Sequence, residues 1–161
     1  MNLQTEKILL LIVQYDRQVR HAMMSVSLKK DGFNDWLEIG SDYEHNKELV
    51  LKLRRDKGVY VIRAHKPIVR IKGESDIIYI GQGTIQSRIQ VLLRSFLPMN
   101  FREYYAKHTA REGFERVMKE TDIKLELSCA IAKDPREKER RLLMAYCNDH
   151  IEPPPLNNTR R

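Results

Sequence analysis

Residues 58–64, Gly-Val-Tyr-Val-Ile-Arg-Ala, and residues 76–81, Asp-Ile-Ile-Tyr-Ile-Gly, decide the fold of this chain. Both stretches are rich in β-branched and aromatic residues, a composition that is typical of strands. Pro67, Lys72 and Gly73 lie between them and favour a basic connection in the form of a long hairpin loop. We therefore expect two neighbouring antiparallel strands joined by that loop.

The sequence after the second strand predicts two helical stretches. Apolar residues recur at the spacing of an amphipathic helix, which Pro98 ends: Ile85, Ile89, Leu92, Leu93 and Phe96. A second helical stretch is expected over residues 100–120, with a break at Gly113.

A third strand and a last helix complete the pattern. Residues 123–131 alternate between apolar and polar side chains, as expected of a strand with one exposed face. Asp134, Pro135 and Glu137 fit the N-cap and first turn of a helix that runs to about residue 150. The order β-β-α-α-β-α predicts an α+β fold with a small, three-stranded, largely antiparallel sheet flanked by helices.

The first part of the chain is interpreted as a helical N-terminal extension. An apolar stripe supports one helix near its start, and Ser41 with Glu44 fits a capping box for a second. The predicted organisation is therefore an extension over residues 1–57, a core over 58–157 and a tail over 158–161.

The composition favours a polyanionic partner. The chain has 161 residues, with 29 lysines and arginines against 22 aspartates and glutamates, a formal net charge of +7. The longest apolar run, Ile8 to Val13, is far shorter than the ~20 residues of a membrane span. Cys129 and Cys147 lack the spacing of a zinc site. We therefore expect free thiols in a cytoplasmic protein with no membrane span. The basic charge suits nucleic acid or an acidic membrane surface and does not choose between them.

Two charged residues lie where the helical pattern expects apolar ones. Glu139 shares a predicted helix face with Leu142 and Tyr146, and a buried carboxylate there is costly unless a cation meets it. Arg88 lies at the edge of an apolar stripe, and a guanidinium so held suits the clamping of a phosphate. A structural salt bridge for Glu139 and an ordinary snorkelling side chain for Arg88 are the alternatives.

Tyrosines and glycines occur together in the two predicted hairpin strands. Tyr60 and Tyr79 each lie within a strand, where most tyrosines are simply packed amphipathic side chains. Gly58 and Gly81 lie at strand ends, where a glycine leaves room for another backbone or for a ligand.

Together these residues resemble the signature of the GIY-YIG nuclease family. Its first motifs are similar to Gly58-Val59-Tyr60, Tyr79-Ile80-Gly81 and Arg88 in this chain. Glu139 in a later helix and the Pro-Pro-Leu-Asn segment that ends at Asn157 look like the remaining two. A single motif of this kind would be weak, but five in order, spread over residues 58–157, are specific.

The resemblance implies a divalent-metal-dependent DNA endonuclease that leaves 5′-phosphate and 3′-hydroxyl ends. It implies that Glu139 holds one Mg²⁺ or Mn²⁺ and that Arg88 binds the phosphate. Tyr60 would be the general base and Tyr79 would orient the attacking water. Asn157 would tie the C-terminal segment against the site.

The sequence also departs from the family pattern. The stretch between Tyr60 and Tyr79 is 18 residues long, more than the family's usual connection, and Gln82 stands where many relatives carry a lysine. The candidate DNA-binding residues are Lys57, His65, Lys66, Arg70, Lys72 and Gln82.

Two other functions remain open. One is a DNA-binding module on the same fold with little or no hydrolytic activity, and a weaker one is a basic adaptor that binds RNA or a protein through its N-terminal extension. Restriction, homing and repair nucleases share this core, so the resemblance leaves the DNA specificity open. Cleavage of both strands would need a homodimer or two successive events.

Overall fold

The computed structural model describes residues 28–97, 110–120 and 123–157. Contacts divide the chain into two compact units, Met1–Phe33 and Asn34–Arg161, so the division differs from the boundary predicted at residue 57. The second unit contains every predicted site residue. The predicted tail over 158–161 lies outside the described residues.

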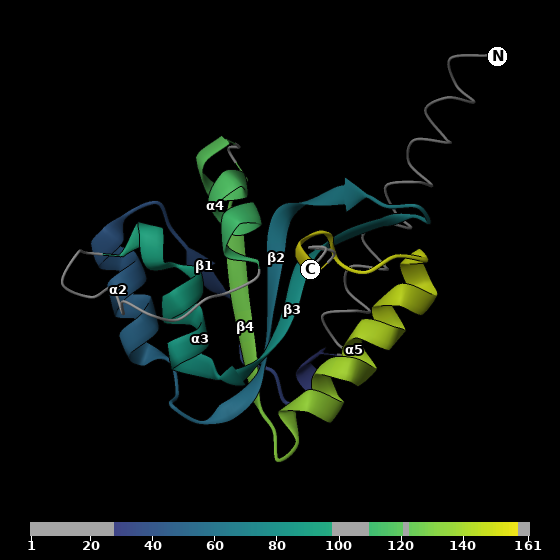
Figure 1. Ribbon diagram of the computed structural model, residues 1–161, viewed down its shortest axis with the longest axis horizontal. Helices are drawn as coiled ribbons and strands as arrows, with labels where there is room; N and C mark the ends of the chain where they lie inside the picture. Colours follow the sequence, from purple (N-terminus) through teal and green to yellow (C-terminus); the bar gives the residue numbers. More distant parts are fainter. Residues whose placement is uncertain (1–27, 98–109, 121–122, 158–161) are drawn as a thin grey trace. The chain divides into compact units, whose positions relative to one another are not determined.

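A four-stranded antiparallel sheet forms the centre of the second unit (Figure 1). Its strands are, in spatial order, β1 (Leu37–Ile39), β4 (Leu125–Ile131), β2 (Lys57–Val69) and β3 (Glu74–Thr84). The α+β class is confirmed. The three predicted strands are β2, β3 and β4, and β1 adds a fourth.

Strand β1 comes from the part of the chain for which the sequence predicts helices. It pairs with β4, with Leu37 opposite Leu127 and Ile39 opposite Leu125. A strand of three residues is too short to produce a recognisable alternation of apolar and polar side chains, and its pairing depends on residues far along the chain.

Helix α2 (Tyr43–Lys52) follows β1. The prediction of Ser41 as its N-cap is wrong, because Asp42 occupies that position and its carboxylate accepts the N–H of Glu44 at 2.8 Å. A negative charge at a helix N-terminus is favoured by the helix dipole, which gives Asp42 an advantage over the neutral serine.

The predicted loop between the first two strands is largely strand. β2 and β3 remain paired as far as Val69 and Glu74, and the Arg70 N–H closes the turn by donating to the Gly73 carbonyl at 3.0 Å. We call residues 65–73 the hairpin arm.

An irregularity in the pairing explains how a proline fits into this arm. The register shifts between Arg63 and Ile68, so Pro67 lies where β2 has no regular ladder partner on β3. A proline is tolerated at such a position because no ladder hydrogen bond depends on its missing N–H.

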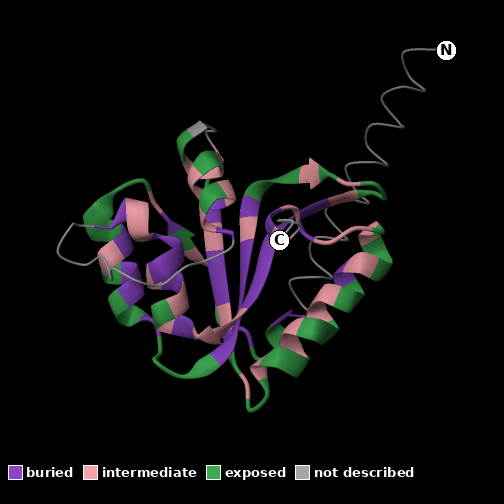
Figure 2. Ribbon diagram, viewed as in Figure 1, coloured by how far each residue is buried: buried purple, intermediate pink, exposed green. Residues whose placement is uncertain are grey.

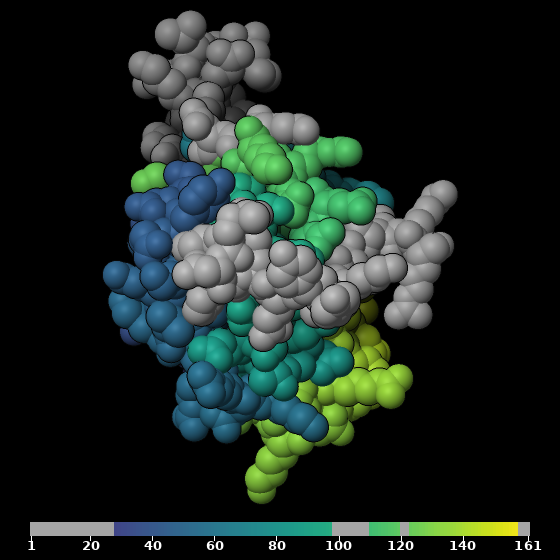
Figure 3. Space-filling model, turned by 60° about the vertical axis from the view of Figure 1, so that its left-hand side comes forward, coloured from purple at the N-terminus to yellow at the C-terminus, as the bar shows by residue number. Residues whose placement is uncertain are grey.

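Helices cover both faces of the sheet. Helices α2, α3 (Ile85–Leu92) and α4 (Arg111–Glu120) lie on one face, and α5 (Pro135–His150) lies on the other (Figures 1 and 2). On the face shown in Figure 3, the teal residues of the β3–α3 segment lie between the blue residues around α2 and the yellow-green residues of α5. None of the helices in the described ranges is long and apolar enough to cross a membrane.

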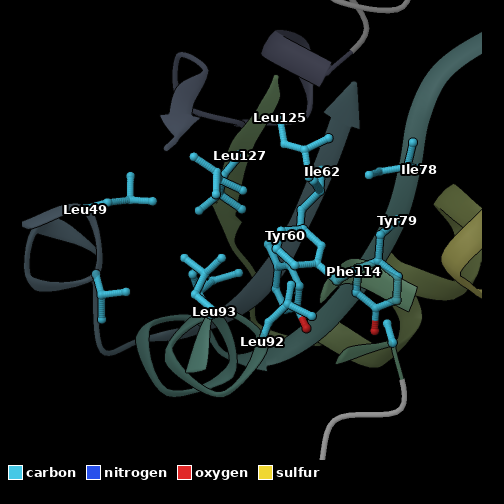
Figure 4. Packing of buried hydrophobic residues seen from close by; sticks show 14 of the residues in the cluster. Leu49, Tyr60, Ile62, Ile78, Tyr79, Leu92, Leu93, Phe114, Leu125 and Leu127 are labelled. Atoms are coloured by element: carbon cyan, nitrogen blue, oxygen red, sulfur yellow. The ribbon is translucent and has the colours of Figure 1, made fainter. Parts of the chain in front are cut away.

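The main hydrophobic core lies between the sheet and the helices α2, α3 and α4 (Figure 4). Its fully buried large side chains include Tyr60, Ile62, Ile89, Leu92, Phe114, Leu125 and Leu127. The predicted break at Gly113 is wrong, because α4 continues through it and carries Phe114 into this core. Much of the helix expected over 100–120 lies outside the described residues.

The start of α5 agrees with the prediction. Asp134 is the N-cap and its Oδ1 accepts the N–H of Glu137 at 3.0 Å, with Pro135 in the first turn. The Glu137 carboxylate instead bonds Arg140, with 2.7 Å between Oε1 and Nη2. Helix α5 therefore leaves the edge of the sheet with a fixed start, and Glu139 lies in its second turn.

Candidate active site

The two predicted catalytic tyrosines lie side by side on the core face of the sheet. Their ring centroids are 5.9 Å apart, with 37° between the ring planes. In the ladder Tyr60 is opposite Gly81, and Ile62 is opposite Tyr79, which places both tyrosine side chains on the same face. Figure 4 shows that their hydroxyl groups point in the same direction.

Gly81 makes room for this pair. A Cβ at residue 81 would lie 2.6 Å from Tyr60 Oη and 2.6 Å from Tyr79 Cε1, closer than atoms can pack. The absence of a side chain at Gly81 therefore lets both rings and hydroxyl groups occupy one small space.

Gly58 has a packing role instead. A Cβ there would collide with the Ala130 carbonyl of β4 and lie 2.7 Å from Ile85 Cδ1 of α3. This agrees with the prediction that a glycine at a strand end admits another backbone. Gly58 thus fixes the start of β2 against β4 and against the first residue of α3.

Arg88 joins the tyrosine pair from α3. It hydrogen-bonds the Tyr60 side chain, and its charge acts on both tyrosines. Its Nε is buried and has no hydrogen-bond partner, which is unusual for a guanidinium N–H. An anion at this position would satisfy it.

Burial dominates the acid–base properties of the pair. It raises the pKa of Tyr60 well above the usual value, with a further increase from Tyr79 and a smaller opposing effect of Arg88. Burial also raises the pKa of Tyr79, while hydrogen bonding to Tyr60 and the charge of Arg88 lower it. In the absence of further cations, both hydroxyl groups are therefore protonated at neutral pH.

Glu139 completes the cluster from α5, as predicted. The residue is partly buried and shares its helix face with the buried Tyr146. Burial raises the pKa of the Glu139 carboxyl, against the opposing charges of Arg88 and Arg136, and the Glu139 charge in turn raises the pKa of Tyr79. The four predicted catalytic residues are thus in electrostatic contact although they come from β2, β3, α3 and α5.

Asn157 ties the C-terminal segment to the outer edge of β3. Its Oδ1 accepts the N–H of Ile80 at 2.9 Å and its Nδ2 donates to the Ile80 carbonyl at 2.7 Å. Ile80 lies between Tyr79 and Gly81, so this side chain supports the segment that carries the second tyrosine, in agreement with the predicted role.

Most of the candidate DNA-binding residues are accessible, but one is not. Lys57, His65, Lys66 and Lys72 are exposed. Arg70 is the exception, because its side chain is only 8% exposed and pairs with Glu152 at 3.0 Å. Its Nη2 also donates to the Pro153 carbonyl at 2.7 Å. The C-terminal segment therefore occupies this guanidinium, a contact that no local pattern in the sequence could indicate.

Gln82 lies near the cluster but does not face the tyrosines. It is opposite Val59, one residue out of step with the Tyr60–Gly81 pair, so its side chain projects from the other face of the sheet.

Two residues of the site were not predicted. Gly83 has a φ of +137°, and a Cβ there would lie 2.8 Å from Arg88 Cγ, so it gives the arginine room. Its only signal in the sequence is the Gly-Gln-Gly run at the end of β3. The charge of Arg136, one turn earlier in α5, lowers the pKa of Glu139. The spacing of three residues in the sequence could have indicated this contact.

The cysteines lie outside this chemistry. Cys129 and Cys147 are free thiols, as predicted. Burial raises the pKa of the Cys129 thiol to about 12, so it is not a nucleophile at neutral pH. Within the ranges that the structure describes, no three side chains of histidine, cysteine, aspartate or glutamate form a cluster that could hold a metal ion.

Comparison with known proteins gave no match to a protein-family model, to a curated protein or to a solved structure.

Proposed function

We propose that the chain is a GIY-YIG-like DNA endonuclease that hydrolyses phosphodiester bonds with the help of a divalent metal ion. The observation that carries the proposal is the electrostatic contact of Tyr60, Tyr79, Arg88 and Glu139, brought together from four elements. Phosphodiester hydrolysis needs a base for water, a cation for the phosphate and help for the leaving oxygen, and this set contains candidates for each.

Arg88 is the residue proposed to bind the scissile phosphate. Its buried Nε lacks a hydrogen-bond partner, and a non-bridging phosphate oxygen would supply one. The fixed planar guanidinium can bind two oxygens at once, which stabilises the charge that develops on them in the transition state.

Tyr60 is proposed as the general base and Tyr79 as the residue that orients the water. Arg88 hydrogen-bonds Tyr60 directly, so its donor would stabilise the phenolate that remains when the proton leaves. The high pKa of the buried Tyr60 means that a further cation is needed before the hydroxyl can act as a base at neutral pH.

Glu139 is the residue proposed to hold Mg²⁺ or Mn²⁺. Its partly buried carboxylate, whose pKa is raised by burial, would be stabilised in its ionised form by a divalent cation. One carboxylate is sufficient when water and phosphate oxygens complete the coordination. When bound, such an ion supplies a positive charge that stabilises the phosphate and lowers nearby pKa values.

The exposed lysines are proposed to hold the DNA. Lys57 lies at the start of β2, three residues before Tyr60, and Lys66 and Lys72 lie on the hairpin arm. Contacts to phosphates position a duplex without reading its sequence. One active site cuts one strand, so cleavage of both strands requires a homodimer or two successive events.

A nicking assay on supercoiled plasmid tests the proposal. The wild-type protein is expected to nick the plasmid with Mg²⁺ and not in EDTA, and the nicks should be sealed by DNA ligase because they carry a 5′-phosphate and a 3′-hydroxyl. Arg88→Ala should abolish nicking, whereas Arg140→Ala, which removes an exposed arginine paired with Glu137, should not. Tight DNA binding without nicking in Mg²⁺ or Mn²⁺ would contradict the proposal and favour a DNA-binding module.

A further inference from the structure

The hairpin arm ends in an exposed apolar surface that the proposed catalytic cluster does not use. Val69 and Ile71, on either side of Arg70 at the turn, are 74% and 70% exposed. Ile151, at the end of α5, is 65% exposed. We call these three residues the apolar tip.

Ile151 is held beside the turn by its two neighbours in the chain. His150 Nδ1 donates to the Lys72 carbonyl at 3.0 Å, and Glu152 Oε1 accepts the N–H of Ile71 at 2.8 Å. The end of α5 and the end of the arm therefore form one surface, although they are about 80 residues apart in sequence.

Ile151 is unfavourable for stability in two respects. Its φ is +67°, and it is the only residue other than glycine with a positive φ in the part of the chain that the structure describes. Glycine or asparagine is the usual residue at such a helix end, and a β-branched side chain is strained there. Because the side chain is also exposed, burial does not offset this strain, and the residue points to a contact with a partner.

Side-chain contacts support the end of the arm. The Arg70 side chain bonds Glu152 and the Pro153 carbonyl beneath the turn, and it is only 8% exposed. A surface that is already ordered loses little conformational entropy when it binds, which suits it to insertion into a partner.

Exposed lysines lie near the tip, in a chain whose formal net charge of +7 suits a polyanion. Acidic residues lie there too, with Glu74 opposite Val69 in the ladder and Asp149 near the end of α5. Lys66 and Lys72 are exposed on the arm, and the Glu152 carboxylate that contacts the turn is neutralised by Arg70. A nucleic-acid duplex offers phosphates for these lysines, but its apolar surface lies between the stacked bases. Proteins that bind DNA through apolar wedges insert branched side chains at that place and unstack the base step.

We propose that the apolar tip inserts into the DNA duplex and unstacks a base step, so that the preferred substrate is DNA that is easily bent or already distorted. This inference rests on the proposed function. Val69 is nine residues from Tyr60 along β2, at most about 30 Å at the usual rise per residue. The unstacked step should therefore lie within about one helical turn of the cleaved bond, since a turn spans about 34 Å.

Duplexes that carry 2-aminopurine at successive positions test the proposal, because the fluorescence of this base rises when it is unstacked. Binding and fluorescence are measured in EDTA, so neither depends on cleavage. The wild-type protein should raise the fluorescence at one or two positions. The double variant Val69→Ser and Ile71→Ser should lose this rise and bind about tenfold more weakly, while Leu51→Ser, at a 54% exposed leucine on α2, should behave as wild type.

Two further variants separate insertion from charge and from folding. Lys66→Ala with Lys72→Ala should reduce the salt dependence of binding by about two ions and keep the fluorescence signal. Ile151→Gly should raise the melting temperature, because it removes the strain, and yet weaken DNA binding.

DNA binding that is unchanged in both Ile151→Gly and the double serine variant would overturn the proposal. So would a loss of self-association, measured by sedimentation, with DNA binding unchanged. Plasmid nicking without any fluorescence change would refute the insertion alone, and a fluorescence change without nicking would refute the nuclease alone.

Discussion

Gly81 lies directly opposite Tyr60 in the β2–β3 ladder, and the tyrosine ring occupies the space in which any other residue would place its Cβ. A Cβ at that position would lie only 2.6 Å from Tyr60 Oη, which leaves no room even for a methyl group. The glycine is therefore a steric requirement of the tyrosine pair.

Gly81→Ala should consequently disturb both tyrosines. Tyr60 is fully buried and cannot move out into solvent, so the added methyl group has to displace the ring or the strand. Overpacking of this kind costs about 1–3 kcal/mol, to be measured by chemical denaturation. Nicking activity should fall more than stability does, because the hydroxyl groups lose their alignment. Wild-type activity in this variant would show that the spacing of the pair is not critical.

Asn157→Asp tests the support of β3 from the C-terminal segment. A carboxylate can accept the N–H of Ile80 but cannot donate to its carbonyl, and it would face that carbonyl with a negative charge. We expect a loss of about 1–3 kcal/mol in the free energy of unfolding, with a partial loss of nicking. Asn148→Asp, on the exposed surface of α5, is the matched control. Equal effects of the two substitutions would mean that the pairing with Ile80 is weak.

Local sequence signals predicted most of the core, while the grouping of the four cluster residues came from the resemblance to the GIY-YIG family. The β-branched runs around Tyr60 and Tyr79, the helical spacing after Ile85 and the cap at Asp134 each depend on neighbours in the chain, and all four were found in the structure. Local spacing also identified Glu139, because it placed this charged residue on an apolar helix face.

Features that depend on distant contacts were not predicted. β1 exists through its pairing with β4, and the arm is stabilised by residues at the C-terminal end. The position of Arg70 next to Glu152 joins residues 82 positions apart, so a run of basic residues in the sequence could not reveal that one of them is buried. Propensity and spacing carry no information on such pairs.

Glu139→Gln should stabilise the protein in the absence of metal at neutral pH. Burial raises the pKa of this carboxyl above its usual 4.5. The protonated form is therefore favoured by folding, and its contribution to stability is complete below pH 4.5 and is lost as the pH rises through the folded pKa. Thermal unfolding at pH 7 in EDTA should show a higher melting temperature for the variant, with the difference disappearing near pH 4.

Magnesium should reverse the order of the melting temperatures of the wild type and Glu139→Gln. Mg²⁺ is expected to raise the melting temperature of the wild type and not that of Glu139→Gln, and the variant should bind DNA without nicking it. Glu137→Gln is the control on the same helix. The Arg140 hydrogen bond lowers the pKa of Glu137, so its substitution should slightly destabilise the protein and leave nicking intact. An equal response of the two variants to Mg²⁺ would contradict the proposal that Glu139 holds the metal ion.

The tyrosine pair gives a prediction on alkaline stability. Folding raises the pKa of both hydroxyl groups above the usual 10.0, so it favours their neutral forms. Their contribution is complete below pH 10.0 and is lost as the pH rises through the folded pKa values. Above about pH 10, the free energy of unfolding of Tyr60→Phe should therefore exceed that of the wild type. The gain should be smaller for Tyr79→Phe, because burial raises the pKa of Tyr60 further.

Activity separates the roles of the two tyrosines. Tyr60→Phe should lower the nicking rate by a factor of about 10²–10⁴, the usual range for loss of a general base, while DNA affinity stays close to that of the wild type. Tyr79→Phe should have a milder effect, because the role proposed for its hydroxyl group is only to orient the water. The wild-type rate should rise with pH as the base ionises, and Tyr60→Phe should lose that rise.

A Tyr60→Phe rate within about threefold of wild type would place the base outside the pair. A larger defect in Tyr79→Phe than in Tyr60→Phe would exchange the two roles, an assignment consistent with the hydrogen bond from Tyr60 that already lowers the pKa of Tyr79.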